Sequence, residues 1–283
     1  MPFLSDFQGF KHNITIYDPE NALALAKAAQ LAYAYNQEDT IEKTVKSWGF
    51  TGRFELWNVN GTQAYIAAND EAILAVFAGT NERSDWCTNL GFLPMPGPIG
   101  SVHRGFMGAL DLVWAEMQQI IFECKMKRMR DRLKPPSLWF AGHSLGAALA
   151  TLAVARLRME DDQPVHGLYT YGSPRVGDRT FARNFNLEFK PAFRIVNNTD
   201  IVTRVPSRVM LYSHIGNFLY LDIEKKLHTD VHWWYSFLDT VEGAADDFKN
   251  RELGTIADHM MDQYIGGLER NRAFNPYHMA QAG

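Results

Sequence analysis

Residues 142–146 read Gly-His-Ser-Leu-Gly, between an apolar strand-like run at 138–141 and an Ala-rich helical stretch at 147–158. A serine hydroxyl is a weak nucleophile at its ordinary pKa, so enzymes that use one place it on a sharp strand-to-helix turn beside a histidine. The two glycines leave out side chains that would clash at such a turn. The pattern therefore predicts a nucleophile elbow with Ser144 as the attacking group.

A catalytic serine needs a histidine base and a carboxylate that orients it. Open parallel sheets gather their working groups beyond the carboxyl ends of the strands. Asp200 follows the strand-like run 193–196 after a polar turn at 197–199. This position makes Asp200 the candidate acid, although an aspartate that only caps a turn would fit it as well.

The chain has nine histidines that could serve as the base. In folds with this elbow the chain order is serine, acid, histidine, which leaves the five histidines after Asp200: His214, His228, His232, His259 and His278. His259 opens a helical pattern, whereas two of the others flank an aromatic stretch at 233–235 that is typical of packing. Position favours His259, but chain order alone leaves His228 and His232 open.

An oxyanion hole needs two backbone N–H groups aimed at the tetrahedral intermediate. Leu145 follows the nucleophile and would supply the first. Thr80 ends the segment after the apolar run 73–77 and would supply the second, with its hydroxyl holding the loop. In isolation, Gly79-Thr80 also fits a plain strand-ending turn.

Residues 79–101 contain three prolines and four glycines and predict a long irregular segment. Within it, apolar side chains cluster in a way that suits acyl chains or a lipid surface, although they could simply pack on the core. We interpret residues 81–100 as a lid over the site. Its candidate acyl-binding residues are Trp86, Leu90, Phe92, Leu93 and Met95.

The remaining patterns describe the scaffold. Asp18-Pro19 predicts a helix start, and residues 51–78 predict an antiparallel meander. Residues 106–133 predict a long helix, whose basic end at 125–134 we interpret as a solvated face. Strand-like and helical runs then alternate to residue 221, which predicts an α/β fold with a mostly parallel central sheet and helices on both faces. We expect one domain over residues 1–283, with a tail from about 269 to 283.

Composition limits the function classes. The net charge of −4 gives no electrostatic case for nucleic acid as a partner. Cys87 and Cys124 lack metal-site spacing, and we interpret both as free thiols. We expect no metal and no cofactor. No apolar run is long enough to predict a transmembrane segment, and no secretory leader is visible, so we expect either a cytoplasmic protein or a secreted mature form.

Together these motifs resemble those of a known family. Six segments resemble, in order and at matching spacing, the successive motifs of the class 3 lipases, the filamentous-fungal lipase family: 77–80, 102–106, 142–146, 171–177, 197–206 and 258–260. The resemblance covers roughly residues 20–268. It implies the α/β-hydrolase fold, the triad Ser144, Asp200 and His259, the oxyanion donors Thr80 and Leu145, and the lid. Ala78 stands where many members have arginine, and the secreted members are disulfide-stapled, whereas this chain has two cysteines.

The resemblance also implies a reaction. We expect hydrolysis of carboxylic esters, first of all triacylglycerols, through an acyl-enzyme and at a lipid–water interface. The same scaffold and triad serve phospholipases A1, galactolipases and feruloyl-type esterases. A catalytically silent hydrolase fold that acts as a binding module is the alternative outside enzymes, since fold does not fix function.

Overall fold

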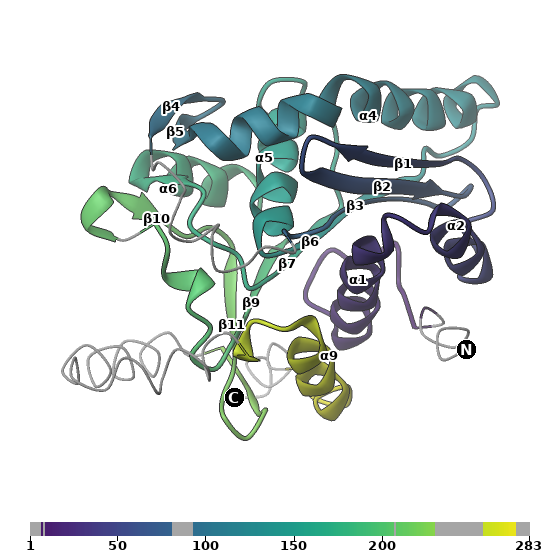
Figure 1. Ribbon diagram of the computed structural model, residues 1–283. Coiled ribbons are helices and arrows are strands. Elements are labelled where there is room, and N and C mark those ends of the chain that lie inside the picture. The colour runs from purple at the N-terminus through teal and green to yellow at the C-terminus, as the bar shows by residue number, and fades with distance from the viewer. Residues whose placement is uncertain (1–6, 8, 81–92, 207, 230–256, 276–283) are drawn as a thin grey trace, which may run out of the picture.

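The structure is a computed structural model, and it describes residues 7, 9–80, 93–206, 208–229 and 257–275. Within these residues, eight strands form one sheet in the order β1-β2-β3-β6-β7-β9-β11-β12 (Figure 1). Their bounds are β1 Phe54–Val59, β2 Thr62–Ala68, β3 Ala72–Phe77, β6 Ser137–His143, β7 Gly167–Tyr171, β9 Ala192–Asn197, β11 Asn217–Leu221 and β12 Leu227–His228. The pairs from β3 to β11 are parallel, and β1, β2 and β12 add antiparallel edges.

Helices cover both faces of this sheet (Figure 1). One face carries α1 Pro19–Leu31, α2 Glu38–Ser47 and α9 Met261–Arg270, and the other carries α4 Arg104–Arg130, α5 Leu145–Met159 and α6 Arg179–Glu188. Alternate residues of each strand supply the two cores: Leu138 and Phe140 pack with α4 and α5, whereas Trp139 and Ala141 pack with α1. This period of two is what a strand buried on both sides requires. The predicted α/β-hydrolase architecture is confirmed.

Local signals define the helix starts. Asp18 caps α1 by accepting hydrogen bonds from the N–H groups of Glu20 at 3.0 Å and Asn21 at 3.2 Å, and Pro19 is the first helical residue. Asp178 caps α6 in the same way, through the N–H of Phe181 at 2.7 Å. Carboxylates at helix N-termini bind the free N–H groups and favour the helix dipole. The predicted start of the first helix is therefore confirmed.

Part of the expected lid is regular structure. Residues 94–97 and 100–103 form β4 (Pro94–Gly97) and β5 (Gly100–His103), an antiparallel pair. They join β8 (Gly177–Asp178) and β10 (Tyr212–Ser213) in a second, four-stranded sheet of order β10-β8-β5-β4. The expectation of an irregular segment is wrong for residues 94–101. Pro94 and Pro96 lie in the edge strand β4, where no partner needs their missing N–H, and Pro98 lies in the turn before β5.

The basic end of α4 is only partly solvated. Lys125 is 5% exposed, and its Nζ donates a hydrogen bond to the carbonyl of Pro164 at 3.0 Å. Burial lowers the pKa of this lysine to about 8, and the nearby charge of Arg158 acts in the same direction. The interpretation of residues 125–134 as a solvated face is therefore wrong for Lys125.

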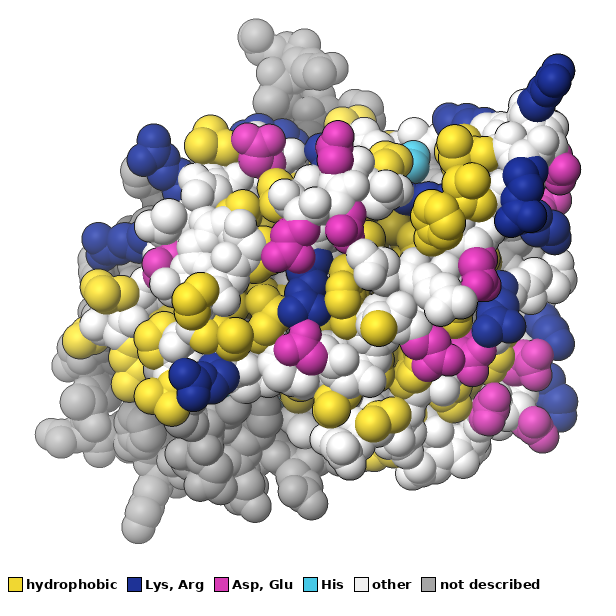
Figure 2. Space-filling model, turned by 90° about the horizontal axis from the view of Figure 1, so that it is seen from above, with side chains coloured by type: hydrophobic (Ala, Val, Ile, Leu, Met, Phe, Trp, Pro, Cys, Tyr) yellow, Lys and Arg dark blue, Asp and Glu magenta, His cyan; other side chains and the backbone are white. Residues whose placement is uncertain are grey.

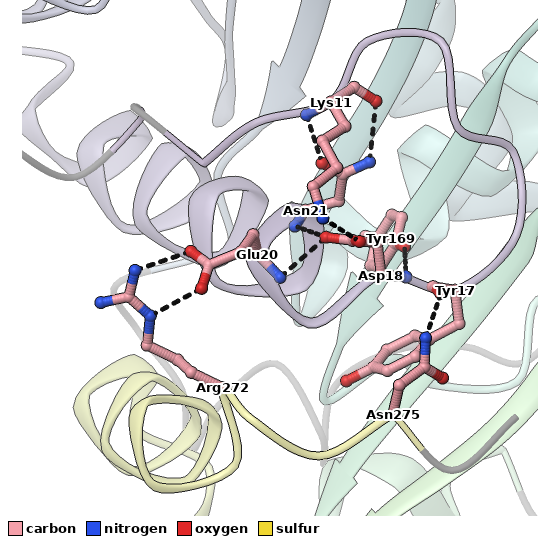
Figure 3. Close-up of polar contacts among 8 residues, drawn as sticks. All are labelled: Lys11, Tyr17, Asp18, Glu20, Asn21, Tyr169, Arg272 and Asn275. Atoms are coloured by element: carbon pink, nitrogen blue, oxygen red, sulfur yellow. Dashed lines mark hydrogen bonds and ion pairs between the residues drawn. The ribbon is translucent and has the colours of Figure 1, made fainter. Parts of the chain in front are cut away.

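The C-terminal segment after α9 is bound to the N-terminal segment (Figure 3). Arg272 donates two hydrogen bonds to the carboxylate of Glu20, at 2.9 and 2.7 Å, and Asn275 Nδ2 donates to the carbonyl of Tyr17 at 3.2 Å. Lys27 of α1 pairs with Glu269 of α9 at 3.3 Å. Residues 269–275, expected as tail, thus fix α9 against α1.

The surface of the described residues carries charges of both signs. On the face shown in Figure 2, acidic and basic side chains are interspersed over the described residues, with no broad field of one sign. No helix within the described ranges is long and apolar enough to cross a membrane.

Candidate active site

The chemistry-bearing residues lie at one edge of the main sheet. Parallel pairing aligns Phe77 with Gly142, His143 with Tyr171, and Tyr171 with Ile195, so β3, β6, β7 and β9 end side by side. The chain beyond these ends carries Thr80 after β3, Ser144 after β6 and Asp200 after β9. This is the edge where open parallel sheets gather their functional groups.

Ser144 occupies the turn between β6 and α5. Its backbone has φ 58° and ψ −128°, a region that residues with a side chain rarely adopt. Close packing forces the turn: a Cβ on Gly142 would lie 2.3 Å from the carbonyl oxygen of Gly146, and one on Gly146 would lie 2.2 Å from that of Phe77. Both glycines are therefore required, as the sequence pattern predicts.

His259 and Asp200 form a buried pair. His259 Nδ1 lies 2.8 Å from Asp200 Oδ2, and the two side chains are 2% and 0% exposed. Because the carboxylate accepts, Nδ1 carries the proton and the other ring nitrogen, Nε2, is left to act as a base. Nε2 is buried and has no hydrogen-bond partner among the described residues. Catalytic hydrogen bonds are often long before substrate binds. The lack of a hydrogen bond between Ser144 and His259 Nε2 is therefore consistent with an active site without substrate.

The carboxylate of Asp200 accepts hydrogen bonds from two further donors. Its Oδ1 accepts the N–H of Val202 at 2.9 Å, and its Oδ2 accepts the hydroxyl of Tyr264 from α9. Burial, followed by the charge of Asp200, raises the pKa of Tyr264 well above its usual value, which keeps the phenol protonated as a donor. A buried carboxylate is costly unless its oxygens are paired, and these contacts provide that pairing.

A glycine makes room for the pair. Gly172 follows β7 with φ 58°, and a Cβ there would lie 2.7 Å from Asp200 Oδ2 and 2.8 Å from His259 Nδ1. The preceding Tyr171 accepts the N–H of Ser144 through its carbonyl at 3.0 Å. The end of β7 therefore lies between the elbow and the His259–Asp200 pair.

A second histidine supports the first. His143, fully buried and adjacent to Ser144 in the chain, packs its ring against that of His259, with centroids 4.4 Å apart and an interplanar angle of 30°. Its Nε2 lies 2.8 Å from the carbonyl oxygen of His259 and donates to it, and its Nδ1 lies 2.5 Å from the hydroxyl of Tyr33. Sequence analysis did not find Tyr33, His143 or Tyr264, because their contacts join segments that lack any shared local pattern.

The backbone of the expected oxyanion strand lies against the nucleophile. A Cβ on Gly79 would lie 2.8 Å from Ser144 Cβ and 2.3 Å from the Tyr33 hydroxyl. Gly79 therefore lies against the elbow, Thr80 is the residue that follows it, and Leu145 is the first residue of α5. Of the lid residues, Leu93 is 58% exposed and Met95 packs against the core, while Trp86, Leu90 and Phe92 lie outside the described residues.

None of the other described histidines after Asp200 contacts its carboxylate, and the remaining ones lie outside the described residues. His228 Nε2 pairs with Asp222 at 2.7 Å in the turn after β11, and His214 Nε2 bonds the carbonyl of Thr203 at 2.8 Å. His232 and His278 fall outside the described residues, as does Cys87, so only Cys124 is seen, in no disulfide with any described residue. No metal-ligand cluster occurs in the described ranges. His259 is thus the described histidine that meets Asp200.

A cavity of about 420 Å³ lies between α4 and the loop after α5. Its lining includes Gln118, Phe122 and Asp161 and none of the triad candidates. It offers no serine, histidine or cysteine, so the sheet edge and not this cavity is the candidate site.

Comparison with known proteins agrees with this geometry. Residues 74–210 match the family model for Lipase (class 3). The chain is 35% identical over 170 residues to secreted mono- and diacylglycerol lipase 1 of Fusarium solani, covering 57% of this chain and 48% of that protein. It is 38% identical over 155 residues to the chloroplastic phospholipase A(1) DAD1 of Arabidopsis thaliana, covering 49% and 34%.

The fold has solved counterparts. The crystal structure of an MDLA mutant from Penicillium cyclopium superposes with a TM-score of 0.61 at 24% identity, covering 75% of this chain and 83% of that one. The chain spans half or less of the length of the two curated relatives. The matched segment runs from β3 past Asp200 and includes the elbow. Residues 74–210 are thus similar to the class 3 lipases, and the chain shares its fold with the Penicillium cyclopium structure.

Proposed function

We propose that this protein hydrolyses carboxylic esters, first of all triacylglycerols, through the triad Ser144, His259 and Asp200. One observation carries the proposal. A buried histidine, oriented by a buried carboxylate and with its second nitrogen unpaired among the described residues, shares one sheet edge with a serine on a strained elbow. This is the arrangement by which a neutral imidazole activates a hydroxyl.

Each group has one task in the reaction. Ser144 Oγ attacks the ester carbonyl while His259 Nε2 takes its proton, and the same nitrogen then returns the proton to the departing alcohol. Asp200 holds the ring and stabilises the imidazolium that forms. Water then attacks the acyl-enzyme in the same manner and releases the fatty acid. We propose that the N–H groups of Thr80 and Leu145 hold the oxyanion in both halves, since both lie beside the elbow.

The substrate class rests on the relatives. The Fusarium protein is named a mono- and diacylglycerol lipase, which favours acylglycerols. The Arabidopsis relative is named a phospholipase A(1), so a phospholipid ester is the second candidate. No described contact favours a galactolipid or feruloyl ester. The buried His259–Asp200 pair and the strained elbow at Ser144 argue against a catalytically silent binding module.

We also propose that the protein acts at a lipid–water interface, with residues 81–100 as the lid. The exposed Leu93 at the described end of that segment supports this proposal. The Fusarium relative is named as secreted, which favours the secreted alternative and gives the cytoplasmic one no support.

A panel of esters tests the proposal. Initial rates are measured on glycerol esters from acetate to oleate, and on a phosphatidylcholine, a galactolipid and a feruloyl ester. We expect the highest kcat/KM on a tri- or diacylglycerol. A clear preference for phosphatidylcholine would mean that the substrate is a phospholipid and not an acylglycerol. The absence of hydrolysis of every ester would overturn the proposed function.

A further inference from the structure

The base and the acid stand 59 residues apart in the chain, and a neighbouring carboxylate joins their segments. Asp258 directly precedes His259. Its Oδ2 accepts hydrogen bonds from Asn198 Nδ2 at 2.9 Å, Thr199 Oγ1 at 2.7 Å and Thr199 N at 3.3 Å. Its backbone carbonyl accepts from Asn197 Nδ2 at 2.7 Å. Asp258 thus contacts each of the three residues that lead to Asp200.

The turn that Asp258 holds has a defined shape. Asn198 has φ 42°, the left-handed conformation that asparagine tolerates better than most residues. Asn197 is fixed from two sides, because its Oδ1 accepts Lys225 Nζ at 2.8 Å and its N–H donates to the Tyr264 hydroxyl at 3.2 Å. The carboxylate of Asp258 therefore binds a turn that is itself anchored, and not a free loop.

We propose that Asp258 is a positioning residue, which sets the distance and angle between His259 and Asp200 by tying the base segment to the acid turn. This inference rests on the proposed function. Asp258 does not compete for the role of acid, because Asp200 is the carboxylate at His259 Nδ1 and the hydrogen bonds of Asp258 go to the turn. Hydrogen bonds to an ionised carboxylate are the stronger kind, so three of them suit this task.

The contact between Asp258 and the turn at residues 197–199 matters because the rate depends steeply on the geometry of the triad. Only one hydrogen bond, at 2.8 Å, joins the imidazole to its acid, and the ring must also aim Nε2 at the serine. A misplacement of about 1 Å in such a site can cost on the order of 100-fold in rate. Loss of the hydrogen bonds between Asp258 and the turn at residues 197–199 should therefore lower kcat and leave KM little changed, because Asp258 touches neither the elbow nor the expected acyl site.

The first experiment compares three variants of the full chain. Asp258→Ala removes the carboxylate and should lower kcat about 100-fold. Asp258→Asn keeps an acceptor oxygen for Thr199 and should retain about a tenth or more of wild-type kcat. Asp18→Ala is the control, since that carboxylate also accepts three hydrogen bonds, from Glu20 N, Asn21 N and Lys11 Nζ, but it caps the start of α1 and not the acid turn. It should keep wild-type kcat.

A double-mutant cycle tests whether Asp258 acts through its hydrogen bonds to the turn at residues 197–199. Thr199→Val removes one donor to Asp258. If both residues belong to one contact, the double variant Asp258→Ala/Thr199→Val should be no slower than Asp258→Ala alone. Losses that multiply would mean that Asp258 acts by another route, which would overturn the proposal.

Proton NMR separates positioning from a loss of stability. The His259 Nδ1 proton, shared with Asp200, gives a far-downfield signal. It should broaden or shift in Asp258→Ala and persist in Asp18→Ala, both measured below their melting temperatures. An unchanged signal with unchanged kcat in Asp258→Ala would overturn the inference. This signal needs no turnover, so it tests Asp258 even if Ser144→Ala stays active and the proposed function fails.

Discussion

Asp200 is a carboxylate with no solvent exposure, and its surroundings account for that position. Val202, His259 and Tyr264 each direct a donor at one of its two oxygens. Removing one partner from such a group leaves a buried charge uncompensated, which is strongly destabilising. The acid is therefore coupled both to the base and to the fold, and a variant that keeps the shape of the side chain is the cleaner probe of its role.

The base and the acid should act as one unit. We expect His259→Ala and Asp200→Asn each to lower kcat by roughly 10⁴-fold, and the double variant to lose little more, because triad members are not independent. Ester hydrolysis by the two single variants and the double variant measures this.

His228→Ala and His232→Ala are the controls for the base, and both should retain most of their kcat. An inactive His232→Ala beside an active His259→Ala would mean that the base is misassigned. Losses that multiply in the double variant would mean that the acid and the base work separately.

Thr80 is expected to contribute both its N–H and its hydroxyl to the oxyanion site. Thr80→Val keeps the backbone donor and removes the hydroxyl, so kcat should fall on the order of 100-fold if both donate. Thr80→Ser, which keeps the hydroxyl, is the matched control. A fully active valine variant would restrict Thr80 to its backbone.

Some residues of the site could be predicted from the sequence and others could not. Ser144 is marked by its own neighbours, and Asp200 by the strand and the turn before it. His259 needed chain order and family resemblance, and its contact with Asp200 is now visible. Tyr33, His143, Tyr264 and Asp258 carried no local signal, since their roles arise from contacts between distant segments.

At the scale of elements, the main strands and helices follow from alternation, caps and the proline-glycine boundaries. The β4–β5 hairpin does not, because prolines and glycines predict a loop and its pairing with β8 is non-local. The helix α2 was also missed, because it buries only Ile41 and Val45, and two apolar residues one turn apart are too few to mark a helix.

The lid can be tested although most of its length lies outside the described residues. Replacing Trp86 and Phe92 with serine should lower activity on emulsified long-chain triacylglycerol far more than on soluble butyrate esters, because the lid is expected to meet lipid. Leu133→Ser, at an exposed apolar residue in the loop after α4, is the control. Equal losses on both substrates would make the segment ordinary surface.

His103 couples the start of α4 to pH. It is fully buried, its Nδ1 accepts the N–H of Phe106 at 3.3 Å, and burial lowers its pKa to about 4. The unfolded chain, with an ordinary histidine pKa near 6.5, binds a proton that the folded chain does not, so this contribution to stability is present above pH 6.5 and is lost as pH falls toward 4.

His103→Asn keeps an acceptor for the helix cap and removes the titration. We expect its melting temperature to fall less between pH 7 and pH 5 than that of the wild type. The absolute stability of the variant is lower, since a stacking contact with Phe106 is lost. Parallel curves for the two proteins would contradict this account of His103.

For the whole molecule, we propose that residues 1–283 form a single domain. Both core clusters pack on opposite faces of the same strands, and the contacts of Glu20 with Arg272 and of Lys27 with Glu269 bind the two ends of the chain together. Calorimetry should then record one cooperative unfolding transition. Two separate transitions would contradict the single domain.

The proposed function requires that Ser144 is a nucleophile, and covalent labelling measures this most directly. Intact-protein mass spectrometry after treatment with a fluorophosphonate should show one adduct per chain, and peptide mapping should locate it on Ser144. Labelling should be lost in Ser144→Ala and slowed in His259→Ala, with both variants folded. Labelling of Ser144→Ala at the wild-type rate, or an adduct on another serine, would contradict the account.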